Sequence, residues 1–226
     1  LPVAFGVTAP DAGTDTSRIS TRAIDDGNGG FVVRGRKIWT SKALESEVCL
    51  LLARTDDADP DDPRRRFDGL SLFLVDLDPA FCDIAPIPKL GRNAVASCEV
   101  AYDDLPVEGW RLVGERGRGF QQILHGLNPE RVLLAAMACG IGEAAIRRAV
   151  GYANERIVFD RPIGANQAIA HPLAQAHMQL NAVGLTWRDA AWRYDQGLEC
   201  GAQLRVVTGA ELEAGYPLVH KLVRVR

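Results

Sequence analysis

The sequence predicts an α+β protein in which a β-barrel or β-sandwich domain, residues 1–116, precedes a helical, bundle-type domain, residues 117–226. Three observations predict this order. Short apolar runs bounded by turn residues fill the first half, which is typical of β-strands. From Phe120 onward, apolar residues recur at helical spacing. Gly117 and Gly119 mark the change from one pattern to the other.

Four segments of the first half have strand-like patterns. Residues 30–39 are interpreted as two short strands separated by a tight turn, residues 47–54 and 70–75 are apolar runs, and residues 97–102 alternate before Asp103 and Pro106. The segment from Asp56 to Asp68 is rich in Asp and Arg, and such a charged, Pro-containing insert indicates a solvated hairpin loop. These strands, with short connections, predict the β domain.

The second half contains two helical patterns. The first begins at Phe120 and continues to Ile146, and Pro129 within it suits a first helical turn or a kink. The second extends from about His171 to Asp195, and Gly197 is a suitable stop. After about residue 200 the amphipathic pattern is lost and the sequence ends in basic residues, so this tail is a doubtful part of the helical domain.

Composition excludes several classes of function. The chain has 226 residues, of which 47% are hydrophobic and 24% charged, which is ordinary for a globular protein with one large or two small cores. A net charge of −3 argues against nucleic-acid binding. No apolar run approaches the length of a membrane span. The five cysteines are scattered singly and the four histidines are dispersed, which predicts reduced, packed thiols and no metal site.

Two segments suit the binding of a flavin dinucleotide. Residues 5–15 combine small residues, hydroxyls and backbone N–H groups in one loop, and residues 35–41 end in Trp39, Thr40 and Ser41. Together they offer donors for a charged pyrophosphate and a flat wall for a planar ring. Each segment alone has a simpler explanation, because such turns need only glycine's freedom and a strand Trp is usually packing.

A third segment, residues 154–169, lies between the two helical patterns. The three segments, in this order and at this spacing, resemble the acyl-CoA dehydrogenase family of flavoenzymes from the first residue to about Gly197. The resemblance implies FAD as cofactor and α,β-dehydrogenation of an acyl-CoA thioester, in which a base removes the α-proton and hydride passes to flavin N5. It also implies an electron-transferring flavoprotein as acceptor, a homo-oligomer (dimer or tetramer), and fatty acid β-oxidation.

The resemblance covers the family's middle domain and part of its C-terminal helical domain. The N-terminal helical domain and the last helices of the family are not visible, so we expect an incomplete gene product. The expected location is cytoplasmic in a bacterium, or the mitochondrial matrix if the source is eukaryotic. Acyl-chain length cannot be deduced. A CoA phosphate site between Asp56 and Asp68 is the weaker alternative to a solvated loop.

By resemblance, Val7 and Thr8 contact the flavin pyrimidine edge, Trp39 lies beside the ring, and Ser41 bonds N5. Arg156 reaches the pyrophosphate of a neighbouring subunit's flavin, a task that suits its planar set of donors. The full set of implied cofactor residues is Phe5, Val7, Thr8, Gly13, Thr14, Trp39, Thr40, Ser41, Arg156, Phe159 and Gln167. Two residues depart from the family pattern: Ala9 replaces a frequent Glu, and Asp160 replaces a Gly.

Glu130 matches the position of the catalytic base in a minority of the family, and Arg131 and Asn128 match residues associated with the CoA substrate. A carboxylate in a dry apolar pocket is a stronger base than in water. Two alternatives stay open: the base comes from a C-terminal Glu beyond the resemblance, or Glu130 is a first-turn acid favoured by the helix dipole.

Three other functions fit parts of the pattern. A non-catalytic, truncated remnant would keep the fold without an assembled site. A flavin oxidase or monooxygenase would use the same fold with oxygen as acceptor. A plain β-sandwich binding module would explain the strands but not the three separated flavin-like segments.

Overall fold

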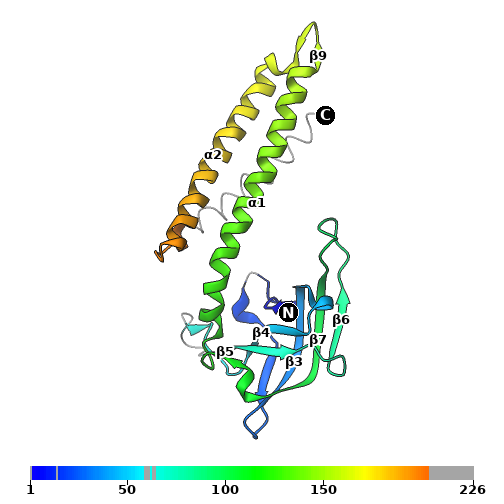
Figure 1. Cartoon of the computed structure of the whole chain (residues 1–226), viewed down its shortest axis with the longest axis vertical. Helices are drawn as coiled ribbons and strands as arrows, with labels where there is room; N and C mark the ends of the chain where they lie inside the picture. The colour runs from blue at the N-terminus through cyan, green and yellow to red at the C-terminus, as the bar shows by residue number, and fades with distance from the viewer. Residues whose placement is uncertain (1, 14, 59–61, 63–64, 204–226) are drawn as a thin grey trace. The chain divides into compact units, whose positions relative to one another are not determined.

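The computed structural model describes residues 2–13, 15–58, 62 and 65–203. The fold is mixed α+β as predicted, with a sheet followed by helices (Figure 1). The chain divides into two compact units, Leu1–Leu124 and His125–Arg226.

The first unit is built on an eight-stranded sheet in the order β6-β7-β3-β2-β4-β5-β8, with β1 paired in parallel to β4. The strands are β1 (Val3–Gly6), β2 (Arg22–Asp25), β3 (Phe31–Ser41), β4 (Val48–Arg54), β5 (Leu70–Asp76), β6 (Cys82–Pro86), β7 (Ser97–Val107) and β8 (Leu112–Val113). In the described residues β6 and β8 form the two ends of this order, so the predicted β domain is present but is not closed as a barrel.

One face of the sheet carries the core of this unit. Phe31 and Phe73 meet edge to face with ring centroids 5.0 Å apart, a favoured aromatic geometry. The fully buried side chains around them come from the inward positions of β3, β4, β5 and β7, as the two-residue period of a strand requires. The β4–β5 connection is the hairpin that the charged segment predicted, since these strands pair antiparallel.

β3 is one strand and not the two short strands predicted for residues 30–39. The misleading signal was Gly35, which has φ +137° and lies so close to Thr21 that a Cβ would be 2.7 Å from the Thr21 Cα. The register between β3 and β7 shifts between Val33 and Gly35, and the strand continues. A glycine inside a strand therefore marks a bulge here and not a turn.

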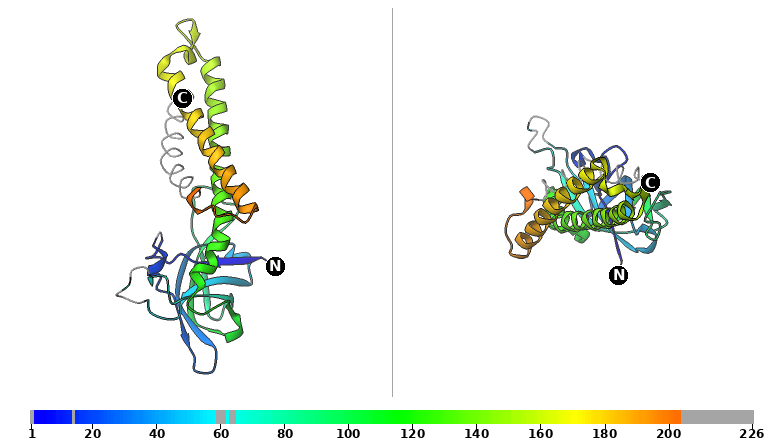
Figure 2. Two further views of the ribbon diagram at one scale, coloured as in Figure 1. Left: turned by 90° about the vertical axis from the view of Figure 1, so that its left-hand side faces the viewer. Right: turned by 90° about the horizontal axis from the view of Figure 1, so that it is seen from above.

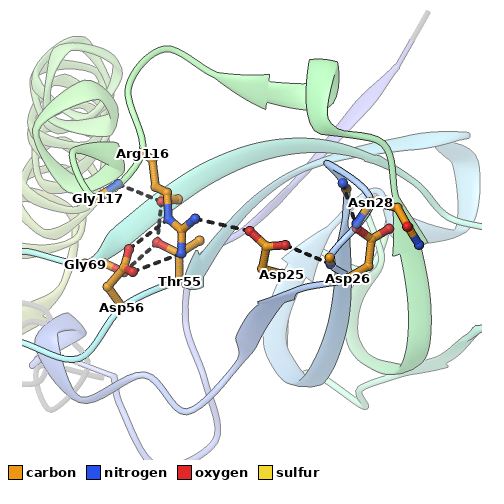
Figure 3. Close-up of polar contacts among 11 residues, drawn as sticks. Asp25, Asp26, Asn28, Thr55, Asp56, Gly69, Arg116 and Gly117 are labelled. Carbon is orange, nitrogen blue, oxygen red and sulfur yellow. Dashed lines mark hydrogen bonds and ion pairs between the residues drawn. The ribbon is translucent and has the colours of Figure 1, made fainter.

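A polar network ties the base of the β4–β5 hairpin to the segment before the first long helix (Figure 3). Arg116 donates from Nη2 and Nε to the Asp56 carboxylate at 2.9 and 3.1 Å, and its Nη1 lies 3.5 Å from Asp25. The bonds from Arg116 lower the pKa of Asp56. Beside this pair, the Ser71 hydroxyl accepts from the Gly117 N–H at 2.8 Å.

Two long helices, α1 (Gly119–Glu155) and α2 (Gln167–Asp195), follow the sheet. Between them lie the short antiparallel strands β9 (Ile157–Val158) and β10 (Arg161–Pro162), as Figure 2 shows. Gly142 of α1 lies against Leu180 of α2, because a Cβ there would be 2.8 Å from a Leu180 methyl.

Both predicted helices are present, but α1 ends at Glu155, nine residues after Ile146, the last residue of the predicted pattern. Pro129 lies within α1, so it is not a first-turn proline. α2 begins four residues before the predicted His171. Gly197 has φ +68° and donates to Tyr194, as a helix stop does. Most of the doubtful tail, residues 204–226, lies outside the described residues.

Candidate flavin and substrate residues

The loop after β1 is attached to β3 by two hydrogen bonds. The Ile38 N–H donates to the Thr8 carbonyl at 2.9 Å, and Lys37 Nζ donates to the Val7 carbonyl at 2.8 Å. Within the loop, Ala9 and Ala12 exchange backbone hydrogen bonds and are both buried. The first two flavin-like segments, about 30 residues apart in sequence, are therefore adjacent.

Trp39 occupies an unusual backbone position. Between Lys37 and Thr40 the register with β7 shifts by one residue, and Trp39 is in the left-handed region with φ +62°. Such a conformation costs about 1–2 kcal/mol for a residue other than glycine. The indole is 54% exposed, so core packing does not explain the strain. A strained residue with an exposed aromatic ring is a candidate ligand contact.

Three hydroxyls near this bulge have no hydrogen-bond partner among the described residues. The Thr40 Oγ1 is fully buried and unpaired, and an unpaired buried hydroxyl is costly. The hydroxyls of Thr8, which is half-buried, and Ser41, which is exposed, make no hydrogen bond to the described chain. The accessible hydroxyls of Thr8 and Ser41 beside an exposed indole form a donor set that fits a planar, acceptor-rich ring, so these residues fit a flavin.

The other first-unit residues lie at the edges of this region. Phe5 is in β1 opposite Leu50 and is 38% exposed. Gly13 lies in open space after the Ala9–Ala12 turn. Thr14 lies outside the described residues. The contacts proposed for these three residues stay predictions.

In the second unit, Asn128 and Arg131 lie one helical turn apart on α1. Arg131 Nη1 donates to Asn128 Oδ1 at 3.4 Å. Glu130 is exposed and lies well inside α1, so its interpretation as a first-turn acid stabilised by the helix dipole is wrong. Nothing in α1 by itself surrounds the Glu130 carboxylate with apolar atoms, and its role as a base stays a prediction.

The third flavin-like segment forms the β9–β10 turn. Arg156 and Gln167 are exposed at its two ends, and Phe159 is 92% exposed at its tip. Phe159 and Asp160 have φ +51° and +58°, so the turn needs two left-handed residues, the conformation that glycine adopts freely. Asp tolerates this region better than most residues. Arg161 donates to Asn166 at 2.9 Å.

The structure thus assembles Val7, Thr8, Trp39, Thr40 and Ser41 within the first unit, and places Asn128, Glu130, Arg131, Arg156, Phe159 and Gln167 in the second. In the part of the chain that the structure describes, no group of His, Cys, Asp and Glu could hold a metal ion. No helix there is long and apolar enough to cross a membrane. All five cysteines are buried thiols.

Lys37 is the residue that sequence reasoning missed. It is fully buried, and burial lowers its pKa to about 7. Its position could have been found from the strand period, because Phe31, Val33, Gly35 and Lys37 share the inward-facing parity of β3.

Known families match both units. Residues 4–105 match the family model "Acyl-CoA dehydrogenase, middle domain", and residues 117–208 match "Acyl-CoA dehydrogenase, C-terminal domain". The acyl-CoA dehydrogenase FadE12 of Mycobacterium tuberculosis is 35% identical over 202 residues, which are 89% of this chain and 50% of FadE12. The chain spans about half the length of the curated relatives that it matches.

Solved structures share the fold. The butyryl-CoA dehydrogenase of Megasphaera elsdenii is 25% identical with a TM-score of 0.85, over 99% of this chain and 57% of that protein. The FAD complex of PigA is 23% identical with a TM-score of 0.88, over 100% of this chain and 57% of PigA.

Proposed function

We propose that this chain, which belongs to the acyl-CoA dehydrogenase family, binds FAD and takes part in the α,β-dehydrogenation of an acyl-CoA thioester. One observation carries the proposal. The hydrogen bond from Ile38 to Thr8 joins the loop after β1 to the strand end that presents Trp39 and Ser41. Donors and a flat, exposed ring thereby meet at one place, and this combination matches a flavin.

Bound FAD would supply a hydride acceptor. The chain's own residues orient it. Val7 and Thr8 hold the pyrimidine edge, Trp39 covers one side of the ring, and the Ser41 hydroxyl donates toward N5. By the resemblance, Arg156 binds the pyrophosphate of a neighbouring subunit's flavin and Gln167 contacts the cofactor, which makes the working protein a homo-oligomer.

For the substrate, Glu130 removes the α-proton, while Arg131 and Asn128 bind the CoA part. Support comes from the Asn128–Arg131 hydrogen bond, which fixes two polar side chains within one turn of Glu130. The base could instead come from a Glu outside this chain, since the chain spans about half of its relatives. An electron-transferring flavoprotein is the proposed oxidant, in fatty acid β-oxidation in the cytoplasm of a bacterium.

The test is an anaerobic titration of the FAD-loaded chain with butyryl-CoA while the oxidised flavin band is recorded. Bleaching of that band supports dehydrogenation, and peroxide formation on admitting air would instead favour an oxidase. Retained FAD without bleaching by short or long acyl-CoA would contradict dehydrogenation by this chain and leave a binding remnant. A colourless protein after FAD addition and gel filtration would contradict the whole proposal.

A further inference from the structure

Lys37 is a charged residue in a place where charge is costly. Its side chain is fully buried within the first unit, yet among the described residues it forms one hydrogen bond, to the Val7 carbonyl at 2.8 Å. A buried ammonium needs strong compensation, and replacing such a group by an apolar one is often neutral or stabilising. The fold alone therefore gives no reason for a lysine at this position.

The close approach of β1 to Lys37 is built into the backbone. Gly6 lies directly against the lysine stem, because a Cβ there would be 3.5 Å from Lys37 Cγ and 3.1 Å from Cys49 Sγ. Without a side chain at Gly6, the end of β1 passes over Lys37 and brings the Val7 carbonyl within reach. The next hydrogen bond, from Ile38 to Thr8, continues the same attachment.

The carbonyl that Lys37 holds belongs to the same peptide group as the Thr8 N–H. A cation on the oxygen side of a peptide group polarises it and makes its N–H a stronger donor. In the proposed function, Val7 and Thr8 face the pyrimidine edge of FAD, where negative charge gathers when the cofactor is reduced. Lys37 can thus act on that edge through one peptide group, without touching it.

We propose that Lys37 is a positioning residue of the flavin site, which fixes the Val7–Thr8 peptide group and strengthens its N–H as a donor to the reduced cofactor. The second half of this inference rests on the proposed function, while the first half does not. The positive charge of Lys37 on which this effect depends changes with pH near neutrality, because burial lowers the pKa of Lys37 to about 7.

The other titratable groups around Lys37 stay neutral between pH 6 and 9. Cys49 faces it from β4, and burial raises its pKa to about 11. Tyr102 from β7 donates to Cys49 Sγ at 3.7 Å, and its pKa is raised well above 10. β1 contributes no titratable side chain. Between pH 6 and 9, a change in this cluster therefore reports Lys37.

The first experiment needs no cofactor. Amide exchange of peptides covering residues 6–13 is compared among the wild type, Lys37→Met, Lys37→Gln and the control Lys89→Met, since Lys89 also donates to loop carbonyls, those of Arg92 and Val95. We expect exchange roughly 10- to 150-fold faster in Lys37→Met, the scale of one lost charge-assisted hydrogen bond, a smaller increase in Lys37→Gln, and no change in Lys89→Met. Equal protection in all four proteins would overturn the inference.

The second experiment measures the midpoint potential of bound FAD against pH. The potential should be lower in Lys37→Met than in the wild type below pH 7, and the difference should shrink as pH rises above 7. Identical potentials at every pH would overturn the electrostatic half. If the wild type retains no FAD, the proposed function fails while the exchange comparison still decides the positioning role. If Lys37→Met does not fold, Lys37→Gln, which keeps an uncharged donor, decides both measurements.

Discussion

Trp39→Asn should separate the stability of the fold from the binding of the cofactor. Asn adopts the left-handed region more readily than Trp, so the substitution relieves about 1–2 kcal/mol of backbone strain at φ +62°. The indole is 54% exposed, and removing it uncovers roughly half of the area that an aromatic side chain buries, or about 100 Å². At about 25 cal/mol per Å², this loss costs about 2–3 kcal/mol.

The two terms largely offset each other, so the free energy of unfolding of Trp39→Asn should be lower than that of the wild type by only about 0–2 kcal/mol in a urea titration. Loss of ring stacking should weaken FAD by about 1–3 kcal/mol, or roughly 5- to 150-fold in Kd. Trp110→Asn is the matched control, because Trp110 is also exposed in the same unit. Unchanged FAD affinity in Trp39→Asn, or a stability loss well above 3 kcal/mol, would refute the assignment.

In a fluorescence titration, Trp39→Phe should also remove most of the quenching caused by FAD.

Three further substitutions test other parts of the account. Glu130→Gln should abolish flavin bleaching by acyl-CoA without changing FAD affinity, and retained bleaching would eliminate Glu130 as the base. Gly69→Ala should be far more destabilising in urea than Gly27→Ala, because both have positive φ but only the Cβ at Gly69 would be 2.1 Å from the Asp56 carbonyl oxygen. Equal losses would show that the loop moves aside. Folding lowers the pKa of Lys37 from 10.5 to about 7, so the free energy of unfolding of the wild type rises with pH between these two values. The advantage of Lys37→Met over the wild type in free energy of unfolding should therefore be largest at pH 6 and shrink toward pH 10. If the difference in free energy of unfolding between the two proteins did not change with pH, the Lys37 ammonium would have to be solvated and not buried.

The pattern of apolar residues predicted the sheet-then-helix order because burial on one face imposes its period on each element. It failed at Gly35, where local freedom was taken for a turn; at Pro129, which lies inside α1 although its ring disfavours that place, only the first-turn alternative is wrong. In both places pairing or packing over many residues outweighs the local preference of one.

The candidate site was predictable as a set of residue types but not as a geometry. Trp39 and Ser41 follow from the motif, whereas the left-handed backbone that presents the indole depends on pairing with β7. Lys37 was missed because lysine is rarely fully buried, so its inward parity in β3 carried no weight. The residue types around Asp160 likewise do not reveal that the backbone of this turn has a positive φ at Asp160.

The most direct test of the central claim is hydrogen–deuterium exchange of the whole chain with and without FAD. We predict that peptides covering residues 5–13 and 37–42 gain protection together, because the Ile38–Thr8 and Lys37–Val7 hydrogen bonds make them one surface. Peptides from β6 and the Asp78–Phe81 turn should not change. If FAD protected only other segments, or protected no segment at all, a flavin site built from the β1 loop and the end of β3 would be contradicted.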